Sequence, residues 1–176
     1  MSNIADVPDL LHGNASSVSY VQRRHGKGGL PSSPQCNVVG TQLQIPYSAQ
    51  YLFWQQDRCL PMGTPAVIRV SKDFSPLLGF YSEGIQYYKF NGSSWNNFNV
   101  SADLYNSPGQ EVVGRHYFPT KPDQNGGQRT WELFMPFSQV TAKAVSSITK
   151  QSDSIGWSKL KATSHGGKVP KSGLRL

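Results

Sequence analysis

His116 is the residue of this sequence best suited to proton transfer or ligand binding. It stands in the run Gly114-Arg115-His116-Tyr117, close to the end of a predicted strand. A histidine there could act as a general base, bond a ligand or bind a metal, because its ordinary pKa lies near neutrality. The alternative is a histidine that is hydrogen-bonded to the backbone inside a packed barrel. In a catalytic interpretation, Arg115 or Arg23 would hold an anionic substrate beside it.

Gln22 and Arg23 form a second pair of candidates. They lie in a segment with strand alternation, so their side chains point to opposite faces and one of them faces inward. A buried Gln or Arg needs hydrogen-bond partners, which either the protein or a ligand supplies. The sequence leaves both sources open.

Aromatic residues beside planar polar residues indicate a third kind of site. Trp95 precedes two asparagines, and Trp131 precedes Glu132. Carbohydrate sites combine an aromatic face with such polar side chains, and Tyr117 adds a further ring. The same rings are also expected in the core of any small β protein.

Common catalytic and cofactor motifs are absent from the sequence. It contains no G-x-S-x-G, H-E-x-x-H, phosphate-binding loop or dinucleotide fingerprint. The histidines lack metal-ligand spacing, and two cysteines cannot form a zinc site alone. We therefore expect neither a metal nor a cofactor. A Cys36–Cys59 disulfide requires the chain to fold back, because a straight strand between the two residues would hold them too far apart.

Alternating apolar residues and frequent turn signals predict an all-β fold. The clearest strand is 42–55, where Pro46 indicates an edge position or a bulge. Residues 138–150 could form one short helix or, because they are rich in β-branched residues, a strand. The close spacing of the strands predicts a single antiparallel barrel or sandwich with at most one short helix. The other predicted strands are 18–23, 66–70, 77–81, 85–90, 95–100, 103–105, 111–117, 129–134 and 155–162.

A chain of 176 residues is expected to form one β domain over 18–168, with a loosely ordered lead over 1–17 and a basic tail over 169–176. The net charge is +7, and basic residues gather around Arg23 and towards the C-terminus. If these two groups adjoin, they form one basic face, and otherwise they are a solvated surface. No nucleic-acid-binding motif is present, so we expect no nucleic-acid partner. We also expect no membrane span, and the first residues lack the apolar centre of a signal peptide.

Several runs resemble an uncharacterised family of small, mostly secreted fungal and bacterial proteins. Residues 18–54 contain Tyr20-Val21-Gln22-Arg23 and, further on, Ile45-Pro46-Tyr47-Ser48-Ala49, and they are similar to the family's closing segment. Matches to the family's opening and middle come later, at 84–88 and 112–117, with a further match at 155–162. The order therefore resembles a circular permutant. In such a permutant residues 57–65 would join the ancestral ends, and Met1 and Leu176 would lie close together.

The resemblance implies an extracellular location but supplies no function. Some members of the family are labelled malate dehydrogenase. This sequence contradicts that label, because it lacks the glycine turn that binds a pyrophosphate at a helix start.

We expect a ligand-binding or surface-interaction protein, with a glycan, bound in a lectin-like manner, as the first candidate. The alternative is a small β-barrel enzyme that acts on an anionic small molecule or a sugar, with His116 as acid/base. The sequence does not predict an oligomeric state. The candidate catalytic residues are His116 and Arg115, and the candidate ligand-binding residues are Gln22, Arg23, Trp95, Tyr117, Trp131 and Glu132.

Overall fold

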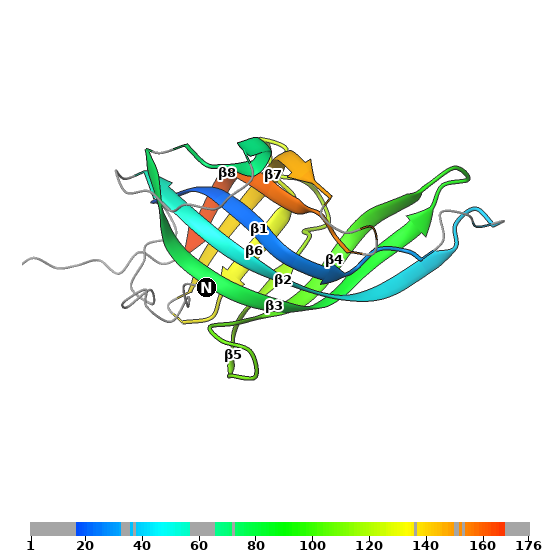
Figure 1. Ribbon diagram of the computed structural model, residues 1–176, viewed down its shortest axis with the longest axis horizontal. Coiled ribbons are helices and arrows are strands. Elements are labelled where there is room, and N and C mark those ends of the chain that lie inside the picture. The colour runs from blue at the N-terminus through cyan, green and yellow to red at the C-terminus, as the bar shows by residue number, and fades with distance from the viewer. Residues whose placement is uncertain are drawn as a thin grey trace, which may run out of the picture.

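The computed structural model describes residues 17–32, 36, 38–56, 66–71, 73–135, 137–149, 152 and 154–167. Over these residues the chain forms eight strands in one closed antiparallel barrel (Figure 1). One short 3-10 turn, η4 (Ala66–Ile68), accompanies them. The strands are β1 (Val18–Gly28), β2 (Gln42–Gln56), β3 (Phe74–Phe90), β4 (Trp95–Tyr105), β5 (Val112–Tyr117), β6 (Arg129–Leu133), β7 (Ser138–Ile148) and β8 (Trp157–Gly167).

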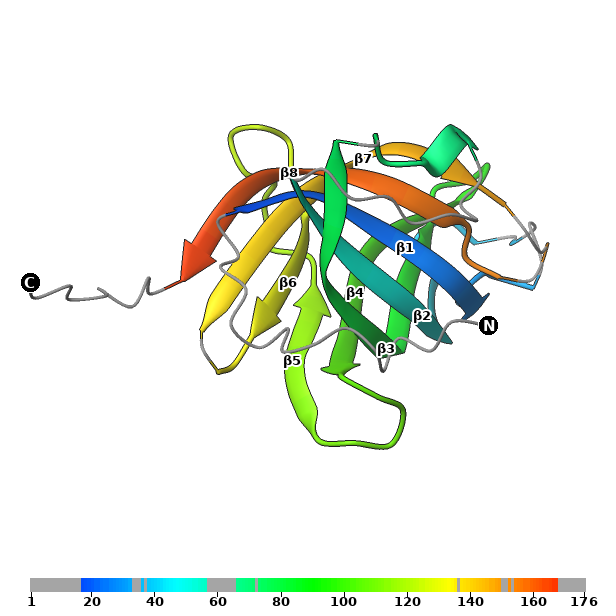
Figure 2. The ribbon, with the colours of Figure 1, turned by 60° about the vertical axis from the view of Figure 1, so that its left-hand side comes forward.

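Each strand pairs with its neighbours in sequence, and β8 pairs with β1 to close the ring. Tyr20 of β1 lies opposite Lys161 of β8, and Arg23 lies opposite Ser158. The two strands run side by side in Figure 2, β1 in blue and β8 in orange to red. The prediction of an all-β, antiparallel fold is therefore confirmed, and the chain adopts the barrel of the two architectures considered. No helix of the described part is long and apolar enough to cross a bilayer.

Alternate residues of the strands build the core. In β2, Tyr47, Ala49, Tyr51 and Phe53 are all buried, so the face predicted from the sequence is the inward one. The same period of two places residues from the other strands in the interior. Among them are Val21, Leu78, Phe80, Val100, Ala102, Leu104, Trp131, Val140, Ala142 and Leu160.

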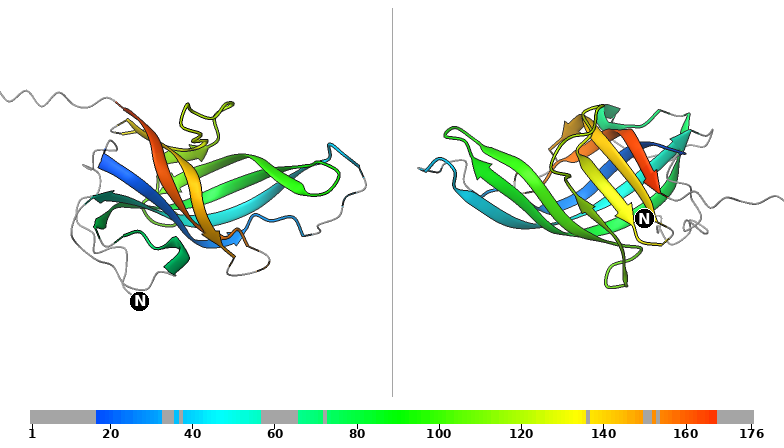
Figure 3. Two further views of the ribbon diagram at one scale, coloured as in Figure 1. Left: turned by 90° about the horizontal axis from the view of Figure 1, so that it is seen from above. Right: turned by 180° about the vertical axis from the view of Figure 1, so that it is seen from behind.

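The strands β2, β3 and β4 continue beyond the barrel as a three-stranded extension, formed by residues 42–46, 85–90 and 95–100. Pairing of β1 with β2 stops at Gly28 and Tyr47, and pairing of β5 with β4 starts only at Ser101. The extension projects to one side in Figure 1 and in the left view of Figure 3. We call the barrel end beside it the extension end.

Gly29 and Ile155 close the extension end of the barrel. Gly29 has a φ of 81°, and a Cβ there would lie 2.7 Å from Ile155 Cγ2 and 2.8 Å from Tyr47 Cβ. The hydroxyl of Tyr88 donates a hydrogen bond of 2.6 Å to the Gly29 carbonyl. Only glycine combines this backbone conformation with such close packing.

Some predicted elements were wrong. Residues 66–70 do not form a strand, because Ala66–Ile68 is a 3-10 turn that buries Ile68. The strands predicted at 77–81 and 85–90 belong to the single strand β3, and those at 95–100 and 103–105 belong to β4. For 138–150, where a helix and a strand were both open, the structure has the strand β7 (Ser138–Ile148), whose alternate residues Val140 and Ala142 enter the core.

Other predictions concern residues outside the described part. They include the lead over 1–17 except for Ser17, the joining segment 57–65, the tail over 169–176 and the position of Cys59. The disulfide, the domain boundaries and the approach of Met1 to Leu176 therefore stay predictions. Pairing of β1 with β8 does not show whether the chain is a circular permutant. In any closed barrel whose strands follow one another in sequence order, the first and last strands are neighbours.

Candidate functional site

His116 lies inside the barrel, one residue before the end of β5. Its side chain is buried, and Nδ1 lies 2.8 Å from the carbonyl oxygen of Thr130. Because a carbonyl oxygen only accepts, Nδ1 carries the hydrogen and Nε2 carries the free lone pair. The ring stacks on Trp131, with centroids 4.5 Å apart and planes 4° apart. Tyr51 meets it edge-on at 5.1 Å.

This environment keeps the imidazole uncharged. Burial lowers the pKa of His116 to about 3, and the hydrogen bond to Thr130 opposes that shift only in part. The positive charges of Arg23 and Arg129 lower the pKa of His116 further. At neutral pH the ring is therefore a hydrogen-bond donor through Nδ1 and an acceptor through Nε2.

The two arginines enter the interior from separate strands. Arg23 lies opposite the buried Tyr51, and its Nε donates a hydrogen bond of 2.8 Å to the Gly156 carbonyl. Arg129 lies two residues before Trp131 and opposite the buried Ala142, so it shares their inward face. Both arginines are half-buried.

Neither arginine has a carboxylate partner within the described residues. The guanidinium carbon of Arg129 lies 5.4 Å from the ring centre of Phe118. Burial lowers the pKa of Arg129, and the charge of Arg23 lowers it further, whereas Tyr51 raises it. The positive charges of Arg23 and Arg129 therefore repel each other inside the barrel.

Acidic side chains of the described part lie elsewhere. Asp73, Glu83, Asp103 and Glu111 are exposed, Asp123 accepts a hydrogen bond from Thr163, and Glu132 lies on the outer face.

Three buried hydroxyl groups lie in the same interior. Tyr47 of β2 lies within hydrogen-bonding reach of Tyr51 and of Ser82 of β3, and the three hydroxyls have no other partner among the described residues. Burial raises the pKa of Tyr47 well above its ordinary value, and the neighbouring Tyr51 raises it further. A hydroxyl donates one hydrogen bond and can accept two, so this group of three keeps bonding capacity for a ligand.

The end of the interior away from the extension end is apolar. A cavity of about 10 Å³ lies there, which is the space of one water molecule. The residues that line it are Phe53, Leu78, Phe80, Trp131, Leu133, Ser138 and Val140. The barrel interior therefore has a cationic, hydroxyl-bearing part and an apolar part.

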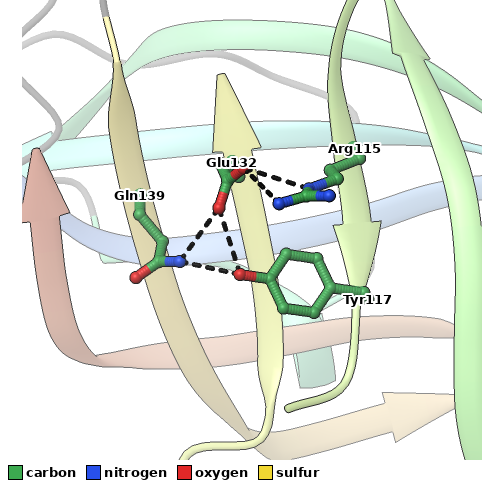
Figure 4. A network of polar contacts seen from close by, with 4 residues as sticks. All are labelled: Arg115, Tyr117, Glu132 and Gln139. Atoms are coloured by element: carbon green, nitrogen blue, oxygen red, sulfur yellow. Dashed lines mark hydrogen bonds and ion pairs between the residues drawn. The ribbon is translucent and has the colours of Figure 1, made fainter. Parts of the chain in front are cut away.

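A separate network covers the outer face of β5, β6 and β7 (Figure 4). Arg115 donates to Glu132 Oε1 from Nε at 3.0 Å and approaches the same oxygen with Nη2 at 2.7 Å. Tyr117 donates its hydroxyl to Glu132 Oε2 at 3.1 Å, and Gln139 donates to the Tyr117 hydroxyl at 2.8 Å. Burial, followed by the charge of Glu132, raises the pKa of Tyr117. The carboxylate is surrounded by donors, so this network ties three strands together.

The predicted site residues divide between these places. His116 and Trp131 stack in the interior, which Arg23 also faces, whereas Arg115, Tyr117 and Glu132 are bonded to one another on the outer face. Trp131 and Glu132 are consecutive in β6 and point to opposite faces. They do not form one sugar-binding surface, although their chemistry fits one.

Gln22 and Trp95 lie apart from both groups. Gln22 is fully buried on the outside of the barrel, where Nε2 donates to the Ile68 carbonyl at 2.9 Å and Oε1 has no hydrogen-bond partner among the described residues. Of the pair Gln22 and Arg23, it is Arg23 that faces the interior. Trp95 stands on the extension and packs on Phe90 at 5.3 Å.

Sequence reasoning missed Arg129. Its position two residues before Trp131 was a usable signal, because the two side chains must share a face. No group of three His, Cys, Asp or Glu side chains in the described part could hold a metal ion.

Comparison with known proteins adds one local match. A family model described as "Protein of unknown function (DUF3455)" matches residues 2–55, less than a third of the chain. Within the described residues the match covers β1 and nearly all of β2. No curated protein and no solved structure matches the chain.

Proposed function

We propose that this protein is a ligand-binding barrel whose interior takes a small organic anion between Arg23 and Arg129. The observation that carries this proposal is the pair of inward guanidinium groups without a carboxylate among the described interior residues. Buried charges in proteins are normally paired, because an isolated charge loses its hydration without compensation. A bound anion would supply the missing charge.

The chemistry of the two side chains fits a carboxylate or phosphate group. Guanidinium groups donate in a planar fork that matches two oxygens of an oxyanion, and such charge-assisted bonds are the stronger kind. Both arginines are half-buried, so part of each side chain remains accessible. The buried hydroxyls of Tyr47, Tyr51 and Ser82 offer further hydrogen bonds to the polar groups of the ligand.

Binding is favoured over acid/base catalysis. A general acid must carry its proton at the working pH, whereas a pKa of about 3 leaves His116 unprotonated near neutrality. In the proposed complex His116 is a neutral acceptor through Nε2. Sugar stacking on Trp131 has no support, since its indole is buried against the imidazole.

Thermal unfolding with a panel of small anions tests the proposal. Acetate, citrate, phosphate and aromatic carboxylates are compared with chloride at equal ionic strength. A ligand at 100 times its Kd raises the free energy of unfolding by about 2.7 kcal/mol. We expect at least one anion to stabilise the wild type, and we expect Arg129→Gln to lose that stabilisation.

Arg115→Gln is the matched control, because it removes a guanidinium from the outer face of β5. This variant should retain the effect of the anion. Without ligand, Arg129→Gln should be at least as stable as the wild type, since it relieves the repulsion with Arg23. The proposal is wrong if no anion stabilises the wild type more than it stabilises Arg129→Gln.

A further inference from the structure

The outer face of β7, β8 and β1 carries a concentration of positive charge, and the carboxylate of Asp123 lies at its margin, on Thr163 of β8. The sequences of these three neighbouring strands contain no Asp and no Glu. Because β1 pairs with β8, the basic groups that lie far apart in the sequence adjoin in the barrel. We call five residues the basic face: Lys143, Lys161 and Lys27, which are exposed, and Lys159 and Arg24, which are half-buried.

Two of these lysines are direct partners across the sheet. Lys143 of β7 lies opposite Lys161 of β8, and such partners have Cβ atoms about 5 Å apart. Like charges at this position destabilise a sheet, so the pair is unfavourable in the free protein. Lys159 adds a third charge on the same side of β8, two residues away.

Two of these lysines donate to neutral groups of the described part. The ammonium of Lys143 donates to the Asn125 carbonyl at 3.2 Å, and that of Lys159 donates to the Arg69 carbonyl at 3.2 Å. Carbonyl oxygens satisfy the donors but do not cancel the charge. The electrostatic potential of the face therefore favours a partner with several negative charges.

We propose that the basic face binds an acidic polysaccharide, whose sulfates or carboxylates repeat along a flexible chain. The outer surface of a barrel is convex, and a flexible chain can follow it across three strands. A DNA duplex is stiff over about 50 nm, so it would touch only the crest of the curved surface. A planar bilayer meets the same restriction.

Single-stranded nucleic acid is a poorer fit, because it needs aromatic rings free for base stacking. Trp157 on this face packs against Arg24 at 5.4 Å and against His25 at 4.8 Å. Tyr20 packs edge-on against Phe74 at 5.0 Å. Neither ring offers an open face in the described part of this surface. The inference stands apart from the interior anion site, whose arginines point to the other side of the sheet.

Binding of a short heparin fragment to the full chain tests the proposal. We compare the wild type with Lys143→Gln/Lys161→Gln, and with the control Lys89→Gln/Arg115→Gln, which removes two exposed positive charges from β3 and β5. Both double variants carry two positive charges fewer than the wild type. The first pair should weaken heparin binding about tenfold or more, and the control less than about threefold, because local potential and not net charge attracts the ligand.

Neither substitution should prevent folding, since removal of an opposed lysine pair relieves repulsion. Binding to heparin should also fall as salt concentration rises, because screening weakens exposed charges. Equal losses in the two double variants would overturn the proposal. Tighter binding to a DNA duplex or to phosphatidylserine vesicles than to heparin would also overturn it. The vesicle comparison matters because the exposed Val67 and Val145 lie close to the basic face.

Discussion

Acidification should destabilise this protein through His116. The folded pKa is about 3, whereas an unfolded histidine titrates near 6.5. Below pH 6.5 the unfolded chain therefore takes up a proton that the folded protein excludes. The free energy of unfolding is highest above pH 6.5 and falls as the pH drops towards 3. The slope is about 1.4 kcal/mol per pH unit within this window, and the loss between pH 7 and pH 5 is about 2 kcal/mol.

Urea unfolding at a series of pH values measures this slope directly. In His116→Gln the slope attributable to this site should disappear, because an amide does not titrate. The glutamine side chain can still donate a hydrogen bond to the Thr130 carbonyl. His165→Gln is the control for loss of an imidazole, since this residue lies towards the exposed end of β8. The free energy of unfolding of His165→Gln should therefore depend more steeply on pH than that of His116→Gln.

Identical pH dependence in the wild type and His116→Gln would refute the reasoning, because His116 would then titrate as it does in the unfolded chain. If His116→Gln does not fold, proton resonances of the wild-type imidazole provide the test. They should not shift between pH 7 and about pH 4.5.

Two further substitutions test the outer network and the packing of the sheet. Glu132→Gln removes the negative charge that helps to raise the pKa of Tyr117, so an absorbance titration should show a lower pKa for that tyrosine, with a loss of about 1 kcal/mol in stability. An unchanged tyrosine titration would contradict the role of the carboxylate. Gly84→Ala should lower the free energy of unfolding by about 1–3 kcal/mol, because its Cβ would lie 2.4 Å from Ala102 Cβ. Gly166→Ala, whose nearest neighbour at 3.0 Å ends a flexible side chain, should cost less, and equal losses in melting temperature would rule out the packing argument.

The period of two and the turn residues were enough to predict the class of fold and most of its strands. The prediction for 42–55 was accurate because alternation is a local property of the chain. The polar run Ser82-Glu83-Gly84 led to the prediction of two strands where the structure has the single strand β3. In the barrel Gly84 lets the strand continue, since Ala102 fills the space where a side chain would be. Ile68 is buried against the outside of the barrel, where its carbonyl accepts a hydrogen bond from Gln22. The apolar residues around it could not be distinguished from a strand by composition alone.

Residue order also determined which neighbours share a face and which do not. It required Gln22 and Arg23, and likewise Trp131 and Glu132, to point in opposite directions. Only closure of β8 onto β1 decided which of those directions is the interior. The approach of Arg23 to His116 and Arg129 depends on β1 facing β5 and β6, which lie far from it in sequence. The basic face is likewise assembled from distant segments, β1 and β7–β8. Such contacts depend on which strands pair and in which register. The alternation of residues within a single strand carries no information about either.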